Sequence, residues 1–131
     1  MRKAIILLAA MSFALAACQE TIEERAAREA RETTEAKCPM PIGDNMFLDS
    51  IVFDIPTRTQ SQYFRFTGES DNDSVVNMLG DAKSVLVNEL KNTPGYQSLM
   101  NADVNFHYVY RSTRDPQKIY LEATVTPADY K

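Results

Sequence analysis

The stretch VVNMLGDAKSVLVNELKN, residues 75–92, determines how the rest of the chain can be arranged. Its apolar residues recur every three or four positions, the spacing that places side chains on one face of an α-helix. These residues are Val75, Leu79, Ala82, Leu86 and Leu90. We expect Asp73 or Ser74 to cap the first turn and the sequence NTPGY at 92–96 to end the helix. Gly80 costs about 1 kcal/mol in a helix relative to alanine, so we expect it to permit a close approach to a sheet.

Two segments with alternating apolar residues lie on each side of this helix. Residues 46–55 and 62–68 precede it, and residues 104–110 and 118–126 follow it. Alternation is typical of a strand with one face against a core, and two such segments joined by a polar turn usually pair as a hairpin. The order β-β-α-β-β therefore predicts an α+β domain over residues 46–131. We expect a four-stranded, mainly antiparallel sheet with one helix packed on one face, and we leave the strand order open.

The composition limits the classes of function. The chain has 131 residues and a formal net charge of −4, which fits one small domain with a tail. An acidic balance gives no electrostatic footprint for nucleic acid, so we expect no nucleic-acid partner. Two cysteines are too few for a disulfide scaffold. The four glycines are scattered and form no phosphate-binding loop.

The N-terminus has the pattern of an export signal. Arg2 and Lys3 precede an apolar run at 4–17, in which Ser12 is the one polar residue. A helix that spans a membrane needs about 20 apolar residues. A basic start followed by a shorter apolar run and small residues is instead typical of a secretory signal peptide. We therefore expect residues 1–17 to be removed on export.

The end of this segment, Leu15-Ala16-Ala17-Cys18, resembles the lipobox of bacterial lipoproteins. The resemblance implies that the Cys18 thiol receives a diacylglyceryl group and that Cys18 becomes the first residue of the mature chain. Its new amine is often acylated as well in that family, and two or more acyl chains give stable membrane attachment. In well-studied lipoproteins an aspartate after the cysteine favours the inner membrane. Gln19 therefore favours the outer membrane.

Residues 20–37 (ETIEERAAREARETTEAK) are rich in charge and alanine and contain no aromatic residue. Thr21 and Glu24 fit a capping box, and pairs of opposite charge such as Glu24/Arg28 favour a helix. The apolar line along this helix is thin, so two interpretations stay open: a semi-rigid helical spacer and a disordered linker. In both, residues 18–45 form a tether between the lipid and the domain.

Three stretches of the globular part are similar to small uncharacterised bacterial envelope lipoproteins. They are LDSIVFD at 48–54, NADVNFHYVYRS at 101–112 and ATVTPADY at 123–130. The resemblance implies an envelope location and a fold. It implies no activity, because none is known for these relatives.

Few residues have a pattern that indicates catalysis or metal binding. His107 is the single histidine, and one imidazole needs further ligands to hold a metal. No serine or cysteine near it lies in a recognisable nucleophile motif. The loop DNDSVVN at 71–77 lacks the glycine and glutamate of a calcium loop, so we interpret Asp71 and Asp73 as loop and capping residues. We expect no enzyme, no metal and no cofactor other than the covalent lipid at Cys18.

One face of the predicted sheet is a candidate binding surface. If the helix covers the other face, this one gathers aromatic and charged side chains from three strands: Tyr63, Arg65, His107, Tyr120 and Glu122. Tyrosine and arginine are frequent at binding hot spots. An ordinary solvated sheet face has a similar composition, so both interpretations stay open.

Cys38 has no partner in its own chain if Cys18 carries the lipid. A single remaining cysteine in an exported protein indicates an intermolecular disulfide or a free thiol. A small apolar side chain packed where the tether meets the domain is the alternative.

Together these patterns predict a lipid-anchored cell-envelope protein whose small domain binds another macromolecule without catalysis. The acidic charge suits a basic protein partner, either an envelope component or a toxin or lysozyme-like enzyme that the domain would inhibit. The alternative is a structural or assembly lipoprotein that self-associates, as a homodimer for example, through the tether or Cys38. A small-ligand carrier is a third hypothesis.

Overall fold

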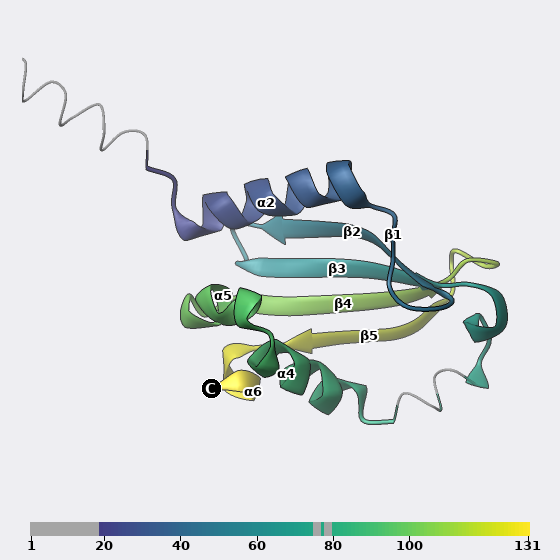
Figure 1. Ribbon diagram of the computed structural model, residues 1–131. Coiled ribbons are helices and arrows are strands. Elements are labelled where there is room, and N and C mark those ends of the chain that lie inside the picture. Colours follow the sequence, from purple (N-terminus) through teal and green to yellow (C-terminus); the bar gives the residue numbers. More distant parts are fainter. Residues whose placement is uncertain (1–18, 75–76, 78–79) are drawn as a thin grey trace, which may run out of the picture.

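The computed structural model describes residues 19–74, 77 and 80–131 (Figure 1). Its elements follow one another as α2 (Ile22–Lys37), β1 (Met40–Pro41), β2 (Met46–Asp54), β3 (Thr59–Phe66), η1 (Gly68–Ser70), α4 (Ala82–Asn92), η2 (Pro94–Tyr96), α5 (Gln97–Asn101), β4 (Asn105–Ser112), β5 (Ile119–Val125) and α6 (Pro127–Tyr130). The predicted signal peptide and the lipobox with Cys18 lie outside the described residues. No helix in the described part is both long enough and apolar enough to cross a membrane.

The described strands form one mixed sheet in the order β1-β2-β3-β4-β5. The two predicted hairpins are present, because β2 pairs with β3 and β4 pairs with β5 in antiparallel fashion. The hairpins are joined through a parallel β3–β4 pairing, which needs a long crossover that includes α4. The predicted α+β class is thus confirmed, whereas the number of strands is five rather than four. The additional strand, β1, pairs antiparallel with β2. It has two residues, and a strand this short gives no alternating pattern in the sequence.

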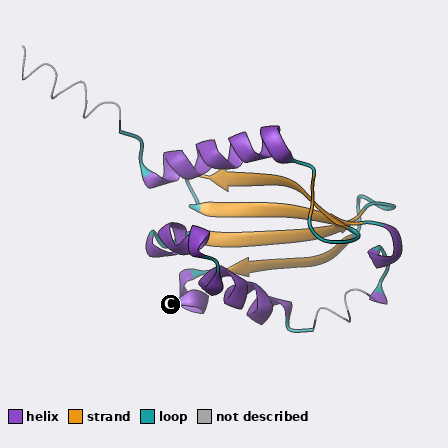
Figure 2. Cartoon of the chain, in the orientation of Figure 1, coloured by secondary structure: helices purple, strands orange, loops and turns teal. Residues whose placement is uncertain are grey.

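Both long helices cover the same face of the sheet. In Figure 2, α2 lies along the first hairpin and α4 lies along the second. The hollow beside α2 is lined by Gln60 and the hollow beside α4 by Gln62, alternate residues on one side of β3. The interior beneath them is centred on Phe106, Leu90 and Val104, each no more than 1% exposed. The prediction of one helix on this face is therefore incomplete.

The predicted helix over 75–92 is interrupted: Ser74 and Asn77 are helical, but Gly80 and Asp81 break the helix. The described helix α4 begins at Ala82, and the Asp81 side chain caps it by accepting a hydrogen bond from the Ser84 backbone N–H at 3.3 Å. Gly80 has φ +55°, a left-handed conformation that does not continue an α-helix. A Cβ at Gly80 would meet no atom within 4 Å, so the expected close approach to the sheet is also wrong. Residues 75–76 and 78–79 lie outside the described part.

Residues 22–37 form the helix α2 and belong to the domain. Thr21 and Glu24 make the predicted capping box. Ala26 and Ala30, 6% and 5% exposed, pack in the core next to β2. Alanine lets the helix approach the sheet closely, and packing against β2 supplies the stability that a thin apolar line cannot give alone. The interpretation of residues 18–45 as a tether apart from the domain is therefore wrong for residues 22–37.

Thr34 fixes α2 to the outer edge of β2. Its hydroxyl donates to the Ile51 carbonyl oxygen at 3.0 Å and accepts from the Ile51 backbone N–H at 2.9 Å. These two backbone groups lie beyond the short pairing of β1 with Phe47 and Leu48. A strand edge with unpaired backbone groups is a template for aggregation unless it is covered. At Ile51 α2 provides that cover.

Candidate functional site

The layer of helices over the sheet is incomplete between α2 and α4. α2 packs on β2 and α4 packs on β5, as Figure 1 shows for each helix. Between them, over β3 and β4, lies a groove that opens to solvent in two adjoining hollows. Ile51 and Tyr96 line both hollows, so we treat the two as one site and call it the interhelix groove.

The larger hollow is apolar and has a volume of about 440 Å³. Residues of β2, β3, β4 and β5 make its floor, α4 makes one wall, and the segment around β1 closes its end. The lining residues that the argument uses are Met40, Met46, Phe64, Val85, Glu89 and Tyr110. Val85 on α4 is 55% exposed, which leaves a large apolar side chain in contact with water at this wall.

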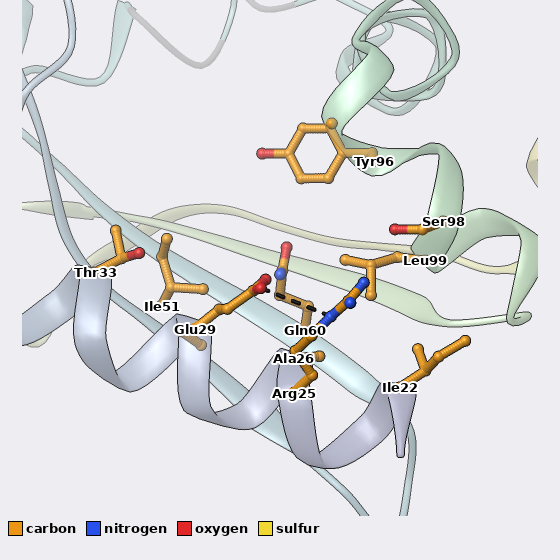
Figure 3. Close-up of a pocket in the computed structure, with 12 residues that line it drawn as sticks. Ile22, Arg25, Ala26, Glu29, Thr33, Ile51, Gln60, Tyr96, Ser98 and Leu99 are labelled. Carbon is orange, nitrogen blue, oxygen red and sulfur yellow. Dashed lines mark ion pairs between the residues drawn. The ribbon is translucent and has the colours of Figure 1, made fainter. Parts of the chain in front are cut away.

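The smaller hollow, of about 170 Å³, lies between α2 and the segment η2–α5 (Figure 3). It is more polar than the larger one. Arg25 and Glu29 line it from α2 and form an exposed ion pair at 3.7 Å. Figure 3 shows Tyr96 extending from η2 over the hollow, on the side opposite α2. Ile22, 46% exposed, lines the same hollow from the first turn of α2.

Tyr96 and Glu89 set the polarity of the groove. The Gln62 side-chain amide donates a hydrogen bond to the Tyr96 hydroxyl oxygen at 3.3 Å, where the two hollows meet. Burial and then the negative charge of Glu89 raise the pKa of Tyr110 to about 12. Among the described residues that line the larger hollow, Glu89 is the one charged group, and it forms no ion pair with any described residue. The groove therefore suits an apolar ligand that carries a positive charge.

The opposite sheet face brings together four of the five residues that the sequence proposed as a binding surface. His107 Nδ1 forms a hydrogen bond with Ser61 Oγ at 2.9 Å, and His107 Nε2 forms one with Glu122 Oε1 at 2.7 Å. The Tyr63 ring meets the His107 ring edge-on, with centroids 6.3 Å apart. Arg65 pairs with Asp49 at 2.7 Å. These polar groups largely satisfy one another, as expected for a solvated sheet face.

Tyr120, the fifth residue, does not lie with them. The β4–β5 register shifts where Tyr110 opposes Leu121 and Arg111 opposes Ile119, so Tyr120 has no partner across the pair. Its ring packs against Phe66, and its hydroxyl donates to Asp71 at 2.7 Å. A one-residue irregularity of this kind turns a side chain out of the alternation from which we placed it.

Ser61, His107 and Glu122 are in the order of a nucleophile, a base and a carboxylate, an arrangement that the sequence did not reveal. Chemistry at Ser61 would also require hydrogen-bond donors aimed at the developing oxyanion. Ser61 lies in the middle of β3, between β2 and β4, where the strand backbone is engaged in the sheet. The arrangement therefore gives no support to an acyl-transfer enzyme.

Asp71 lies in a loop, as predicted, but it is buried and holds two loops together instead of capping a helix. Its side chain, 1% exposed, accepts hydrogen bonds from the backbone N–H groups of Thr113 and Arg114 at 3.1 and 2.9 Å. Burial alone would raise the pKa of Asp71. Hydrogen bonds from Ser112, Tyr120 and these backbone groups outweigh it and hold the pKa well below its ordinary value. A lone aspartate between turns carries no sequence signal for this role.

Cys38 is half-buried and packs against the core cluster. Burial raises the pKa of its thiol, and the negative charge of Asp49 raises it further. A raised pKa lowers the fraction of reactive thiolate. The geometry therefore favours the small apolar role over a reactive thiol. No group of three metal-ligating side chains occurs within the described ranges.

Comparison with known proteins identifies the family. The model of a domain of unknown function, DUF8479, matches residues 21–121. The chain belongs to the DUF8479 family. The match begins at the N-cap of α2, in agreement with the packing of that helix in the core. No curated protein matches this DUF8479 chain.

Three solved structures share the fold. A protein of Pseudomonas aeruginosa described as secreted, PA3611, is 9% identical with a TM-score of 0.68, and the match covers 86% of this chain and 100% of that one. The type 2 secretion pilotin EpsS of Vibrio vulnificus is 12% identical, with a TM-score of 0.58 and coverage of 83% and 91%. The type II secretion pilotin AspS of Vibrio cholerae is 17% identical, with a TM-score of 0.57 and coverage of 88% and 98%. At these identities the similarity concerns the fold.

Proposed function

We propose that this DUF8479 protein is a lipid-anchored protein of the bacterial cell envelope that binds a protein partner without catalysis. The export signal and the lipobox support the location, and Gln19 favours the outer membrane. Two structural neighbours are pilotins of type II secretion systems, which supports a partner that belongs to an envelope assembly rather than a toxin or a lysozyme-like enzyme.

The interhelix groove is the observation on which this proposal depends. Val85, on the wall of this groove, is more than half exposed. A partner bound in the groove would bury this apolar side chain. Exposed apolar surface rimmed by polar groups commonly marks an interaction site. On the opposite sheet face Arg65 pairs with Asp49 and His107 with Glu122, so these groups are less available to a partner than Glu89 is. The groove is therefore the proposed docking site.

Replacing Val85 with arginine is expected to remove partner binding while leaving the fold intact. The substitution places a charge at the solvent-exposed wall of an apolar hollow, where a docked partner would bury it at a cost of several kcal/mol. The matched control is Val52→Arg, because Val52 is 50% exposed and lies on the other sheet face. A tagged full chain is used to capture its partner from the envelope of its own host. The captured partner should be lost with Val85→Arg and kept with Val52→Arg. Equal recovery with both variants would contradict the groove as the docking site.

The anchor is tested separately at Cys18. The mature wild-type chain should begin at Cys18, carry the mass of the attached acyl groups and fractionate with membranes. Each buried methylene contributes about 0.8 kcal/mol to attachment, so Cys18→Ser should move the protein to the soluble fraction. Intact mass spectrometry and membrane fractionation measure both effects. A wild-type chain with an unmodified Cys18 would disprove the anchor.

Self-association through the tether or Cys38 has less support. Ala26 and Ala30, part of the apolar line of α2, are buried within the chain itself, so this line is not available to a second copy. Cys38 packs on the core rather than projecting into solvent. A monomer by size-exclusion chromatography with light scattering agrees with the leading proposal, and a stable dimer favours the alternative.

A further inference from the structure

The start of α2 and the turn between β2 and β3 lie at one end of the domain, which we call the anchor end (residues 20–25 and 55–58). We infer that the anchor end rests on the surface of a lipid bilayer, with Ile22 and Ile55 among the lipid headgroups. This inference rests on the proposed lipid anchor and adds the surface by which the folded domain meets the membrane. It follows from the short connection to the lipid, the exposed isoleucines and the charge at this end.

The connection between the lipid and the folded domain is short. α2 begins at Ile22, and Thr21 caps it. Glu20 is held to α2 as well, because its carboxylate accepts a hydrogen bond from Arg28 Nη2 at 2.6 Å. An extended chain advances by about 3.6 Å per residue at most, so the Cα of Cys18 lies within roughly 7 Å of the Cα of Glu20. A lipid attached to Cys18 therefore keeps the start of α2 next to the headgroups.

The turn between β2 and β3 comes to the bilayer together with α2. Glu23, in the first turn of α2, forms an ion pair with Arg58 at 3.1 Å. The Arg58 backbone N–H in turn donates to the Ile55 carbonyl oxygen at 3.1 Å and closes the turn. Figure 1 shows the same arrangement, in which α2 starts at the end of the domain where β2 finishes.

Two large apolar side chains are exposed at the anchor end. Ile22 is 46% exposed and Ile55 is 43% exposed, and Pro56 beside Ile55 is exposed as well. Exposed apolar surface commonly marks contact with a protein or a membrane. The lipid holds this end against the headgroups, so a bilayer is the surface that these side chains meet first. Removing them from water there favours the docked orientation.

The charge at the anchor end is compatible with a bilayer. Removal of residues 1–17 takes away Arg2 and Lys3 and no acid, which leaves the mature chain with a formal net charge of −6. Anionic lipids attract basic segments and repel acidic ones. The anchor end contains three glutamates and two arginines, a formal charge of −1. Two of these glutamates are held in ion pairs, with Arg28 and Arg58. Most of the negative charge therefore lies elsewhere, and this end meets little repulsion.

A single tryptophan tests this orientation, since the chain contains none. The acylated full chain is purified from its own host and placed in vesicles of phosphatidylethanolamine and phosphatidylglycerol, with or without bromine on the acyl chains. In Ile55→Trp the indole should lie at the level of the headgroups, where tryptophan is enriched in membrane proteins. Its fluorescence should shift to shorter wavelength and be quenched by the brominated lipids. Ile55 is chosen because Ile22 also lines the interhelix groove.

The matched control is Ile119→Trp. Ile119 is 46% exposed and begins β5, at the end of the sheet opposite the start of α2 (Figure 1). The quenched fraction at position 55 should exceed that at position 119 severalfold. Both variants should keep the thermal melting of the wild type, which checks that the fold is intact.

The outcomes separate the inference from the proposed function. If the chain is acylated and position 55 is quenched no more than position 119, the inference is overturned and the lipid-anchored envelope protein stands. If position 55 is shielded from bromine and a photoreactive residue placed there joins a protein in the envelope, a protein covers this end and the inference is again overturned alone. A mature chain without acyl groups overturns the proposed anchor and the inference together.

Discussion

Replacing Asp71 with alanine is expected to lower the free energy of unfolding by about 3 to 5 kcal/mol, the range for removing one partner from a buried charged network. The carboxylate accepts hydrogen bonds from Thr113, Arg114 and Tyr120. Without it these part-buried donors lose their acceptor, and each donor left unpaired costs about 1 to 3 kcal/mol. The loop after β3 and the β4–β5 turn would then keep only weaker contacts, such as the exposed Asp73–Lys118 pair. Urea denaturation followed by circular dichroism measures the change.

The neighbouring carboxylate provides the control. Asp73 forms an ion pair with Lys118, but its side chain is 81% exposed. Exposed pairs contribute about 0 to 1 kcal/mol, so Asp73→Ala should change the stability little. Equal losses for the two variants would contradict the structural role of Asp71.

The same network predicts an acid-sensitive fold. The pKa of Asp71 is held well below its ordinary value in the folded chain, so folding favours its ionised form. This contribution is fully present above the unfolded pKa of about 3.9 and is lost as the pH falls through the folded pKa. Between pH 6 and pH 3 the wild type should therefore lose about 1 kcal/mol more stability than Asp71→Asn. Parallel losses in the two proteins would contradict this prediction.

A chain that begins at Met46 is expected not to fold cooperatively. The truncation removes α2 and β1, exposes Phe53 and Ile51, and frees the Ile51 backbone groups that Thr34 binds. Each large apolar side chain contributes about 1.5 to 3 kcal/mol when fully buried, and each hydrogen bond about 1 kcal/mol. The total is about 5 to 8 kcal/mol, comparable to the whole stability of a small domain. Thermal melting and amide NMR spectra measure the loss.

The control for this truncation is a chain that begins at Gln19 and keeps α2. It should melt cooperatively. Thr34→Val in that chain isolates the hydrogen-bonded part of the effect and should cost about 2 kcal/mol. If the chain from Met46 gives a dispersed spectrum and melts within a few degrees of the longer one, α2 is dispensable and the original domain boundary at residue 46 is restored.

Local patterns in the sequence were sufficient for the two hairpins and for the second half of the central helix. Alternation identified β2, β3, β4 and β5, because each of these strands has one face on a core and one towards solvent. The capping box of Thr21 and Glu24 identified the start of α2. Alternation also placed Tyr63, Arg65, His107 and Glu122 on one face of the sheet, where the structure has them. The placement of Tyr120 was wrong, because the register shift between β4 and β5 depends on both strands and is not visible in the sequence of either one.

The same patterns were insufficient where a property depends on what lies across space. Residues 22–37 look like a solvated spacer, because alanine gives little apolar signal, yet Ala26 and Ala30 are buried against β2. The sequence around Asp71 predicts a loop residue. Asp71 is a buried hydrogen-bond acceptor because the β4–β5 turn packs next to it in the folded chain. Glu89 is one charge among many until α4 is placed beside the open part of the sheet.

The sequence by itself determined the class of the fold and the positions of its four main strands along the chain, because periodicity is a local signal. The lipobox is also local, and it carried the prediction of a lipid-anchored envelope protein. The tertiary structure alone decided that the two hairpins join through a parallel pair, that α2 belongs to the domain, and that α2 and α4 leave a groove between them. The reason is physical: pairing direction, close approach and an unfilled helix layer are relations between distant segments, and no single segment encodes them.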